Sequence, residues 1–548
     1  MQIFPMAASF SITGNLVDVV NKKIYPATVQ VRDGKITAIL PASQSDDEPL
    51  PYIMPGFVDS HVHIESSMLV PSEFARLAVV HGTVATVSDP HEIANVCGMQ
   101  GVEFMINNGK KVPFKFNFGA PSCVPATIFE TAGATLNSKD VQALLEKDEV
   151  KYLSEMMNFP GVLHHDAEVM QKIAAAQALG KPVDGHAPGL RGSTAKQYID
   201  AGISTDHECF TKEEALDKLG YGMKIIIREG SAAKNFEALV GLLNDYPDKM
   251  LFCSDDKHPD SLVAGHINQL CARAVAKGMD IFNVLRAACI NPVVHYKLDV
   301  GQLRLGDDAD FIVVENLQGF KVLQTYINGA LVAEAGKSFI SSVGVTPINN
   351  FNCRNITEED IALPYTGEDQ LLVIEALDGQ LITNKLHLPA CVEDGKLVSN
   401  TTTDMLKIVV VNRYNPAPVT KAFVKNFGLK SGAIASSVAH DSHNIIAVGV
   451  NDASIAQAVN IVIKHSGGVS CVNGTEQQCL PLPIAGLMSA DDGYQVAAAY
   501  TAIHTMAKQL GSKLSAPFMT LSFMGLLVIP HLKLSDLGLF DGDNFSFV

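Results

Sequence analysis

The chain has 548 residues, which at about 100 to 200 residues per domain corresponds to about three or four structural units. Apolar residues make up 47% and charged residues 18% of the chain, and this balance excludes a disordered or fibrous protein. With 41 Lys and Arg against 58 Asp and Glu, the formal net charge is −17, which disfavours nucleic acid or an acidic membrane surface as a partner.

Cysteine usage and hydropathy point to an intracellular protein. The ten cysteines are scattered without a C-x-x-C pair, and the opening segment MQIFPMAASF has neither the basic leader nor the apolar core of a signal peptide. We therefore expect free thiols and a cytoplasmic location. The most apolar stretch, Phe518 to Pro530, is shorter than the roughly 20 residues that a membrane-spanning helix needs, so no membrane span is predicted.

Short strands with hairpin turns are predicted on both flanks of a long central segment. Near the amino end, TVQVR and KITAI alternate apolar with polar residues on either side of Asp33-Gly34, a two-residue hairpin signal. A similar pattern returns after Leu298, with Asn328-Gly329 as the turn. We expect residues 1–50 and 296–346 to form one small β-sandwich domain.

The central residues, 51–295, alternate short β-rich runs with segments of helical period, which is typical of βα units around a parallel sheet. Their length fits one α/β barrel of the (β/α)8 TIM-like type. The candidate strands are IMPGFVDSHVH, GTVATVSD, FKFNFGA, KYLSEM, KPVDGHA, GISTDHE, MKIIIRE and KMLFCSD. Polar residues gather at their carboxyl ends, where barrel enzymes place their chemistry.

A separate C-terminal α/β domain is predicted for residues 347–548. In it, AIASSVAHDSHNIIAVGV is interpreted as two strands flanking a polar loop. The segments ASIAQAVNIVIKHS and YQVAAAYTAIHTMAKQL have helical spacing.

The strongest chemical signal is His61-Val62-His63 at the end of the first barrel strand. Residues two apart on a strand point to the same side, so both imidazoles can reach one metal ion. The H-x-H pattern alone is common, and an ordinary polar strand end is the alternative interpretation.

Later strands supply the residue types that accompany such a pair in a metal site. Glu155, His186, His207 and the pair Asp255-Asp256 all come at predicted strand ends. Nitrogen and carboxylate ligands from five strands on one face suit two divalent cations that share a hydroxide. Taken singly, each histidine could be a hydrogen-bonded structural residue and Glu155 a solvated one.

Seven motifs are distributed over all three regions: HIESSML, SDPHEIANVCG, EMMNFPGV, DGHAPGL, STDHEC, AHDSHNI and LSFMGLLVIPHLKLSDLGLFD. With them the chain resembles the amidohydrolase superfamily, and more closely its bacterial-type adenine deaminases, over its full length. The resemblance implies an enzyme of purine salvage that converts adenine to hypoxanthine and ammonia. In such an enzyme a metal-bridged hydroxide attacks C6 of the purine.

The resemblance also implies two divalent metal ions, Mn²⁺ or Fe²⁺, with Zn²⁺ as a possible substitute. It assigns His61, His63 and Asp255 to the first ion. It assigns His186 and His207 to the second, and Glu155 takes the bridging position that a carboxylated lysine holds in many relatives. Asp255 is also expected to accept the proton of the attacking water and to return it to the leaving amine.

A second group of residues is expected to serve the substrate. Asp89 and His91 end the second barrel strand and either orient the purine and relay protons or cap a helix that begins near Ile93. Arg228, at the end of the seventh strand, either meets the substrate ring or an active-site carboxylate, or forms a structural salt bridge. Asp256, next to the expected ligand, is placed with the substrate-binding residues.

Three further residues complete the expected site. Glu92 is the candidate acid for protonation of N1 or N3 of the ring. His440 and His443, in the polar loop of the C-terminal domain, are expected to face the barrel mouth and help enclose the substrate; a local Asx-rich turn is the alternative. No catalytic cysteine is expected, because the cysteines lie mostly in apolar contexts.

Two other functions stay open at this point. The barrel could belong to another amidohydrolase, such as a cyclic amide hydrolase or a deacetylase, because a fold does not fix the substrate. A non-catalytic scaffold is the second possibility, which the presence of all six expected ligands disfavours. The expected partner is small-molecule adenine, without nucleic acid or membrane, and the family leads us to expect a homodimer or larger homo-oligomer.

Overall fold

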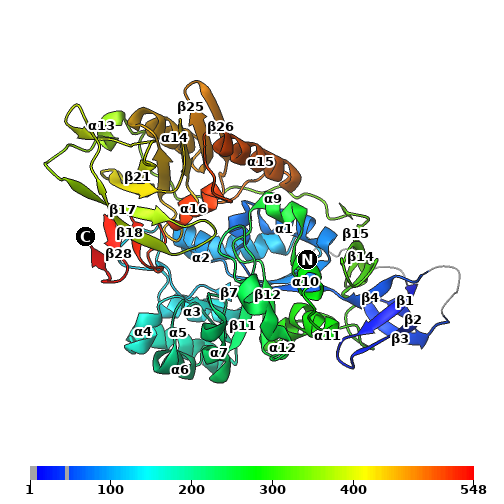
Figure 1. Cartoon of the computed structure of the whole chain (residues 1–548). Helices are drawn as coiled ribbons and strands as arrows, with labels where there is room; N and C mark the ends of the chain where they lie inside the picture. The colour runs from blue at the N-terminus through cyan, green and yellow to red at the C-terminus, as the bar shows by residue number, and fades with distance from the viewer. Residues whose placement is uncertain (1–8, 44–48) are drawn as a thin grey trace.

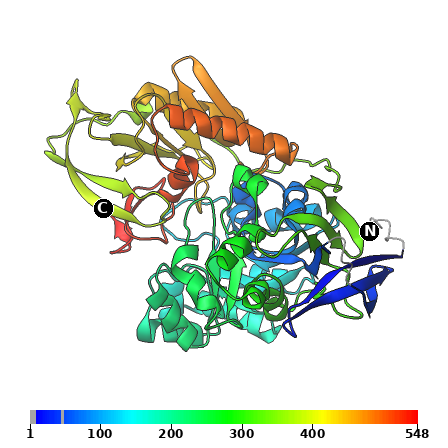
Figure 2. The same cartoon turned by 45° about the vertical axis from the view of Figure 1, so that its right-hand side comes forward.

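The computed structural model describes residues 9–43 and 49–548, so most of the opening segment discussed above lies outside the described residues. A parallel barrel forms the centre of the molecule, a mixed sheet lies beside it, and the C-terminal domain covers one end of it (Figures 1 and 2). Within the described ranges, no helix is long and apolar enough to span a membrane.

The flanking sheet is built from segments on both sides of the barrel in the sequence. Its order is β16-β15-β14-β13-β4-β1-β2-β3. The strands are β1 (Phe10–Asp18), β2 (Lys23–Arg32), β3 (Lys35–Pro41), β4 (Tyr52–Pro55), β13 (Phe311–Val314), β14 (Val322–Ile327), β15 (Ala330–Glu334) and β16 (Lys337–Ser338). Phe10 of β1 stacks on Tyr326 of β14 at 5.1 Å between ring centroids, although two strands separate them in the sheet. The sheet therefore folds back on itself around its own apolar core.

Both expected hairpin turns are present. Asp33 and Gly34 have φ values of 51° and 75°, and Asn328 and Gly329 have values of 48° and 73°. Positive φ at both central residues defines the type I′ turn, which matches the twist of the flanking strands. The two turns also touch, and a Cβ on Gly34 would lie 2.8 Å from the carbonyl oxygen of Asn328.

Eight parallel strands form the barrel, and each corresponds to one of the candidate strands. They are β5 (Phe57–Val62), β6 (Thr83–Ser88), β7 (Lys115–Ala120), β8 (Val150–Met156), β9 (Val183–Gly185), β10 (Thr205–Asp206), β11 (Lys224–Arg228) and β12 (Met250–Cys253). The parallel bridges Val183–Ile203 and Val62–Asp255 join the two halves and close the ring. Closure brings the carboxyl ends of all eight strands to one rim.

Helices surround the barrel and link its strands. They are α1 (Pro71–Ala78), α2 (His91–Gly109), α3 (Ser138–Leu145), α4 (Phe159–Leu163), α5 (Ala167–Ala178), α6 (Gly192–Asp200), α7 (Lys212–Gly220), α8 (Phe236–Leu239), α9 (Pro259–Ala264), α10 (Ile267–Ala276), α11 (Ile281–Leu285) and α12 (Asn291–Tyr296). Asn137 and Asp166 accept backbone hydrogen bonds at the starts of α3 and α5, which explains where these helices begin.

The C-terminal domain contains a second eight-stranded sheet, of order β18-β17-β22-β21-β24-β23-β25-β26. These strands are β17 (Gln370–Ala376), β18 (Thr383–Pro389), β21 (Met405–Val411), β22 (Thr420–Lys425), β23 (Ala433–Ser436), β24 (Ile445–Gly449), β25 (Gly468–Asn473) and β26 (Glu476–Pro481). The helices are α13 (Glu358–Ile361), α14 (Asp452–Lys464), α15 (Gly493–Gln509) and α16 (Pro517–Phe523). Short strands complete it: β19 (Val392–Glu393), β20 (Lys396–Leu397), β27 (Leu532–Leu534), β28 (Leu539–Asp541) and β29 (Ser546–Phe547). The strand pair and both helices expected here are confirmed.

Buried polar contacts fix the C-terminal domain on the barrel. Glu73 of α1 accepts a hydrogen bond from the backbone of Gly493 at 2.9 Å and pairs with Arg76. Arg76 in turn contacts Asp492 at 2.6 Å. The hydroxyl of Tyr500 on α15 lies 2.6 Å from Nδ1 of His258. The domain therefore sits over the carboxyl rim of the barrel as a fixed cover.

We expect Glu73→Ala to lower the free energy of unfolding by about 1 to 3 kcal/mol, because it leaves the buried backbone NH of Gly493 without its acceptor, whereas Arg76 keeps Asp492. Chemical denaturation measures the change. Glu103→Ala is the matched control: Glu103 pairs with Lys147 at the surface, and its loss should cost no more than about 1 kcal/mol. An equal decrease in the free energy of unfolding for the two variants would contradict a stabilising role of Glu73 between the C-terminal domain and the barrel.

Candidate active site

The side chains expected as metal ligands meet at the carboxyl rim of the barrel. His61 belongs to β5 and Glu155 to β8, whereas the others follow their strands by one or two residues: His63 after β5, His186 after β9, His207 after β10 and Asp255 after β12. None of the six is more than 5% exposed. The closed ring of strands thus gathers residues from five strands in one dry pocket.

Glu155 lies at the centre of this group. Its Oε1 is 3.3 Å from Nε2 of His63 and 4.0 Å from Nε2 of His61. Its Oε2 is 2.7 Å from Nδ1 of His186 and 3.2 Å from Nε2 of His207. The two oxygens of one carboxylate therefore face two different pairs of histidines.

Asp255 closes the group from the other side of the barrel. Its Oδ1 lies 3.4 Å from Nε2 of His63 and 3.8 Å from Nε2 of His61. Its backbone NH donates to the carbonyl of His61 at 3.0 Å, and its φ of 54° is in the left-handed region. Such strain in a non-glycine residue persists where the surroundings impose it, as they do here.

The charges in the pocket favour a positive partner. Burial alone would raise the pKa of Glu155, but the surrounding histidines hold it well below its usual value. Burial likewise opposes ionisation of Asp255, yet Arg228 and His63 keep the pKa of this carboxyl well below the ordinary range. Burial, followed by the neighbouring His207 and His63, lowers the pKa of His61 to about 4, which leaves a neutral imidazole that can act as a ligand.

The donor set fits two divalent cations. Nε2 of His61 and Nε2 of His63 are 3.1 Å apart, so a proton or a cation must lie between two lone pairs that would otherwise repel. Five carboxylates line the central cavity against a single arginine, Arg228. Imidazole nitrogen with carboxylate oxygen is the ligand mixture that zinc, iron and manganese accept.

Neighbouring residues hold the ligands in place. Nδ1 of His63 donates to the backbone carbonyl of Asp89 at 3.2 Å, which directs Nε2 into the pocket. Asp59 accepts from the backbone of Ser254 at 2.9 Å and thereby joins β5 to the end of β12. The hydroxyl of Tyr198 donates to the carbonyl of Met156 at 2.7 Å and accepts from the backbone of His186 at 3.1 Å.

Comparisons with known proteins agree with this geometry. A family model described as the amidohydrolase family matches residues 52–332, and one described as the adenine deaminase C-terminal domain matches residues 380–546. A protein of Salinibacter ruber named adenine deaminase is 56% identical over 546 residues, which are 99% of each chain. The chain belongs to the adenine deaminase family.

Other members of the adenine deaminase family are similarly close. A protein of that name from Sulfurovum sp. is 57% identical, over 97% of this chain and 98% of its own. One from Borreliella burgdorferi is 50% identical, over 98% of this chain and 99% of its own. Among solved structures, a β-aspartyl dipeptidase from Fervidobacterium islandicum is 17% identical, with a TM-score of 0.45 over 60% of this chain and 98% of its own.

In this adenine deaminase family member, His91 connects the barrel pocket to the C-terminal domain. Its Nδ1 lies 3.3 Å from Oδ2 of Asp89 and 3.5 Å from Oε1 of Glu155, and its Nε2 lies 3.4 Å from Oδ1 of Asp441. Burial would lower the pKa of His91, but Asp89 and Asp441 raise it well above the usual value. Asp89 also accepts a hydrogen bond from the backbone NH of His91, the first residue of α2, as the capping alternative requires. The role of Asp89 and His91 toward a purine stays a prediction.

Glu92 lies one layer behind the cavity wall. Oγ of Ser66 is 2.8 Å from Oε1 of Glu92 and 2.7 Å from Oδ1 of Asp256, which lines the cavity. Burial, reinforced by Asp256, raises the pKa of Glu92 well above the usual value. Ser66 has one hydroxyl proton and cannot donate to both carboxyl groups at once, and the raised pKa of Glu92 favours Glu92 as the carboxyl group that holds the second proton. Nδ1 of His440 is 3.4 Å from Oε1 of Glu92. The ring of His443 packs against that of His440, with 5.7 Å between the ring centroids.

Sequence reasoning did not single out Glu208, Asp441, Leu381 or Leu526, all of which line the cavity. Glu208 pairs with Arg228, which also contacts Oδ2 of Asp255 at 2.6 Å through its Nε. The position of Glu208 next to His207 in STDHEC was an available signal. The other three come from the C-terminal domain, and their approach to the barrel has no local signature.

We expect the affinity of the site for Mn²⁺ to fall as the pH falls from about 8 to about 6, because bound ions require deprotonated imidazoles. The carboxylates around His63 and His207 outweigh burial and raise the pKa of both well above the usual value, so protons compete at neutral pH. Competition of the metal-free protein with a chelator, at several pH values, measures the effect. An affinity independent of pH would show that protons do not occupy these positions.

Proposed function

We propose that the protein hydrolyses adenine to hypoxanthine and ammonia in purine salvage. The observation that carries the proposal is 56% identity over 99% of the chain to a protein named adenine deaminase. The convergence of four histidines and two carboxylates in one buried pocket supports it, since this is the chemistry that a metal-dependent hydrolase needs.

We assign His61, His63 and Asp255 to one divalent ion and His186 and His207 to the other. Glu155 is proposed as the bridge, and the separate directions of its two oxygens support this role. The ions proposed are Mn²⁺ or Fe²⁺, with Zn²⁺ as a substitute. When bound, such ions lower the pKa of a water molecule to about 7 and so supply hydroxide under mild conditions.

Asp255 is proposed to move the proton of the reaction. Its contact with Arg228 keeps the carboxylate ionised and oriented, so it can accept a proton from the attacking water. The same group then returns the proton to the exocyclic nitrogen, which leaves as ammonia. Arg228 therefore acts on Asp255, rather than on the purine, in this scheme.

Two chains of polar contacts are proposed to serve the purine nitrogens. One runs from Glu92 through Ser66 to Asp256 and supplies a proton from a carboxyl group that burial keeps protonated. The other passes through His91 between Asp441 and Glu155. His440 acts behind Glu92 in the first chain, and His443 supports His440.

The lining of the pocket suits a small base with both apolar faces and N–H groups. Met157, Leu381 and Leu526 provide apolar contacts above the metal ligands, and Glu208 and Asp256 offer oxygens to purine N–H groups. The cavity must already widen to admit a free base, and a ribose would require still more space. Adenosine is therefore expected to be a poor substrate. The cytoplasmic location and the homodimer or larger assembly stay predictions.

Asp255→Asn should retain metal and lose about 10²-fold to 10⁴-fold in kcat, because the amide can still contribute an oxygen but cannot accept the proton. His186→Ala should lose both metal and turnover and remain folded, because its side chain lies at the rim and not in the apolar core. Metal analysis, circular dichroism and ammonia release measure the three properties. His387→Ala, at an exposed strand position, is the control and should match the parent. Substantial adenine turnover by His186→Ala would contradict the assignment.

Asp441→Asn tests the contribution of the C-terminal domain. We expect metal content to be unchanged and kcat to fall at least about tenfold, because His91 loses the carboxylate at its Nε2 and keeps only those at its Nδ1. The pH profile should also shift, because loss of that anion lowers the pKa of His91. An unchanged profile and rate would place Asp441 outside the reaction.

The decisive experiment is purification without oxygen, metal quantification and an ammonia-release assay on adenine. Dihydropyrimidine rings and N-acetylated sugars, assayed in parallel, test the rival amidohydrolase functions. Fully metallated protein that opens such a ring or removes an acetyl group, and leaves adenine unchanged, would overturn the proposal. Protein that binds no metal and has no turnover would favour a scaffold.

A further inference from the structure

A second cavity lies beside the metal pocket. It has a volume of about 510 Å³ and lies between the barrel loops after β8 and β9 and the final segment of the C-terminal domain. The barrel wall includes Phe159 and Pro188, and the opposite wall includes Val528 and Phe545. A cavity of this size with mostly apolar and aromatic walls is typical of small-molecule binding sites.

This cavity and the metal pocket share one thin wall. Met157 lines both of them. Leu526 lines the metal pocket and the next residue, Leu527, lines the outer cavity. On the barrel side, the expected ligand His186 faces the metal pocket and Pro188, two residues later, faces the outer cavity. The two spaces are therefore adjacent across the side chains of Met157 and Leu526.

The metal pocket is too small for a purine as it stands. Its volume is about 20 Å³, which is room for a water molecule, since one probe sphere needs roughly 10 to 15 Å³. All the ligand side chains are buried, so a substrate has to pass a wall of protein to reach them. The outer cavity has room for a purine base without any change.

We propose that the outer cavity is a vestibule that binds the free purine base, and that Met157 and Leu526 form the gate between it and the metal pocket. The inference rests on the proposed function for the identity of the base. A neutral, planar heteroaromatic ring suits the vestibule, because Phe159 and Phe545 offer ring contacts. Asp543 and His164, also in the lining, offer polar partners to ring nitrogens.

The gate can open without movement of the whole C-terminal domain. Lys533 donates from Nζ to the carbonyl of Leu381 at 2.6 Å and to that of Phe523 at 2.9 Å, and this anchors the chain on both sides of the gate. Between α16 and β27, residues 526–531 form turns and belong to no helix or strand. The contacts of Glu73 and Tyr500 hold the rest of the domain on the barrel. The proposed opening is a movement of the segment that carries Leu526, between Phe523 and the contact of Thr383 with the carbonyl of Pro530.

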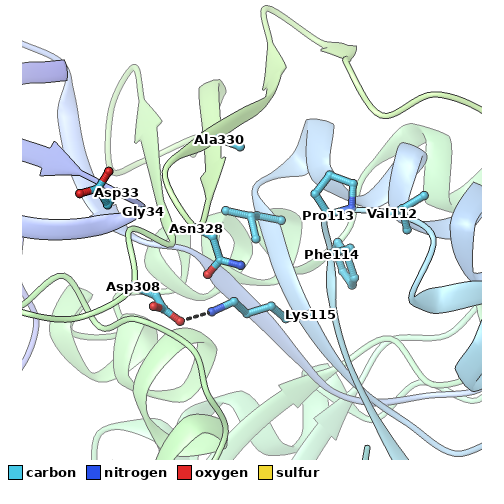
Figure 3. A pocket seen from close by; sticks show the side chains of 10 residues that line it. Asp33, Gly34, Val112, Pro113, Phe114, Lys115, Asp308, Asn328 and Ala330 are labelled. Carbon is cyan, nitrogen blue, oxygen red and sulfur yellow. Dashed lines mark hydrogen bonds and ion pairs between the residues drawn. The ribbon is translucent and has the colours of Figure 1, made fainter. Parts of the chain in front are cut away.

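A third cavity provides a matched control. It has a volume of about 410 Å³ and lies between the two hairpin turns and the start of β7, at the amino end of that strand and therefore away from the carboxyl rim (Figure 3). Ala330 lines it, and Lys115 in its wall is paired with Asp308 at 2.7 Å. It shares no lining residue with the metal pocket.

The test introduces a cysteine into the vestibule and then enlarges its side chain reversibly by modifying the thiol. Val528→Cys is treated with methyl or benzyl methanethiosulfonate. We expect kcat/KM for adenine to fall with adduct size, by at least about tenfold for the benzyl adduct, with unchanged metal content. Dithiothreitol should restore activity, which excludes misfolding as the cause. Adenine and hypoxanthine should each slow the modification of the introduced thiol.

Three comparisons make the outcome decisive. The parent chain controls for its own ten cysteines, and Ala330→Cys, in the third cavity, should keep its kcat/KM after the same treatment. His164→Cys, from the barrel wall of the vestibule, should repeat the Val528→Cys result. Complete benzylation with an unchanged kcat/KM and no protection by adenine would overturn the vestibule. Protection by adenine without any turnover would keep the vestibule and overturn the proposed function.

Discussion

Buried negative charge is the constraint around which this structure is organised. Five carboxylates and one arginine line a cavity from which water is almost excluded, and uncompensated charges cannot persist in such a place. Arg228 neutralises part of the charge through Glu208 and Asp255. The remaining charge favours bound cations or protonated imidazoles, and the imidazoles are already oriented by contacts such as that between His63 and the carbonyl of Asp89.

The C-terminal domain makes the pocket dry as well as complete. Its Asp441 contacts His91, and its Leu381 and Leu526 lie over the ligands. In a medium of low polarity, each charge contact inside the pocket is stronger than it would be at an open barrel mouth. A cover held by buried contacts at Glu73 keeps that environment constant. The barrel alone would expose the same ligands to water.

Much of the fold, and the residues that meet in the candidate site, could be predicted from the sequence, for one physical reason. Strands of a parallel barrel are apolar runs that end in polar residues, so both the eight strands and the residues at their carboxyl ends are visible in the chain. The distance of a side chain from the cavity is not visible in the sequence: Glu92, the second residue of α2, was expected at a strand end and lies behind the cavity wall. Glu208 follows His207 directly beyond the end of β10, and alternation along a strand would turn it away from the pocket, whereas the structure places it in the lining. Asp441 depends on domain packing, which no local pattern encodes.

The flanking sheet pairs strands that the ribosome synthesises far apart in time. β4 pairs with β13, and Pro55 is opposite Phe311, about 256 residues later. At about 5 to 20 residues per second, the ribosome needs roughly 10 to 50 seconds to deliver the second partner after the first has emerged. During that interval β4, at the edge of the sheet that it forms with β1, β2 and β3, lacks its partner β13, and an unpaired strand edge is a template for association with other chains. The long barrel insertion therefore leaves this edge of the nascent protein open until the barrel has been synthesised.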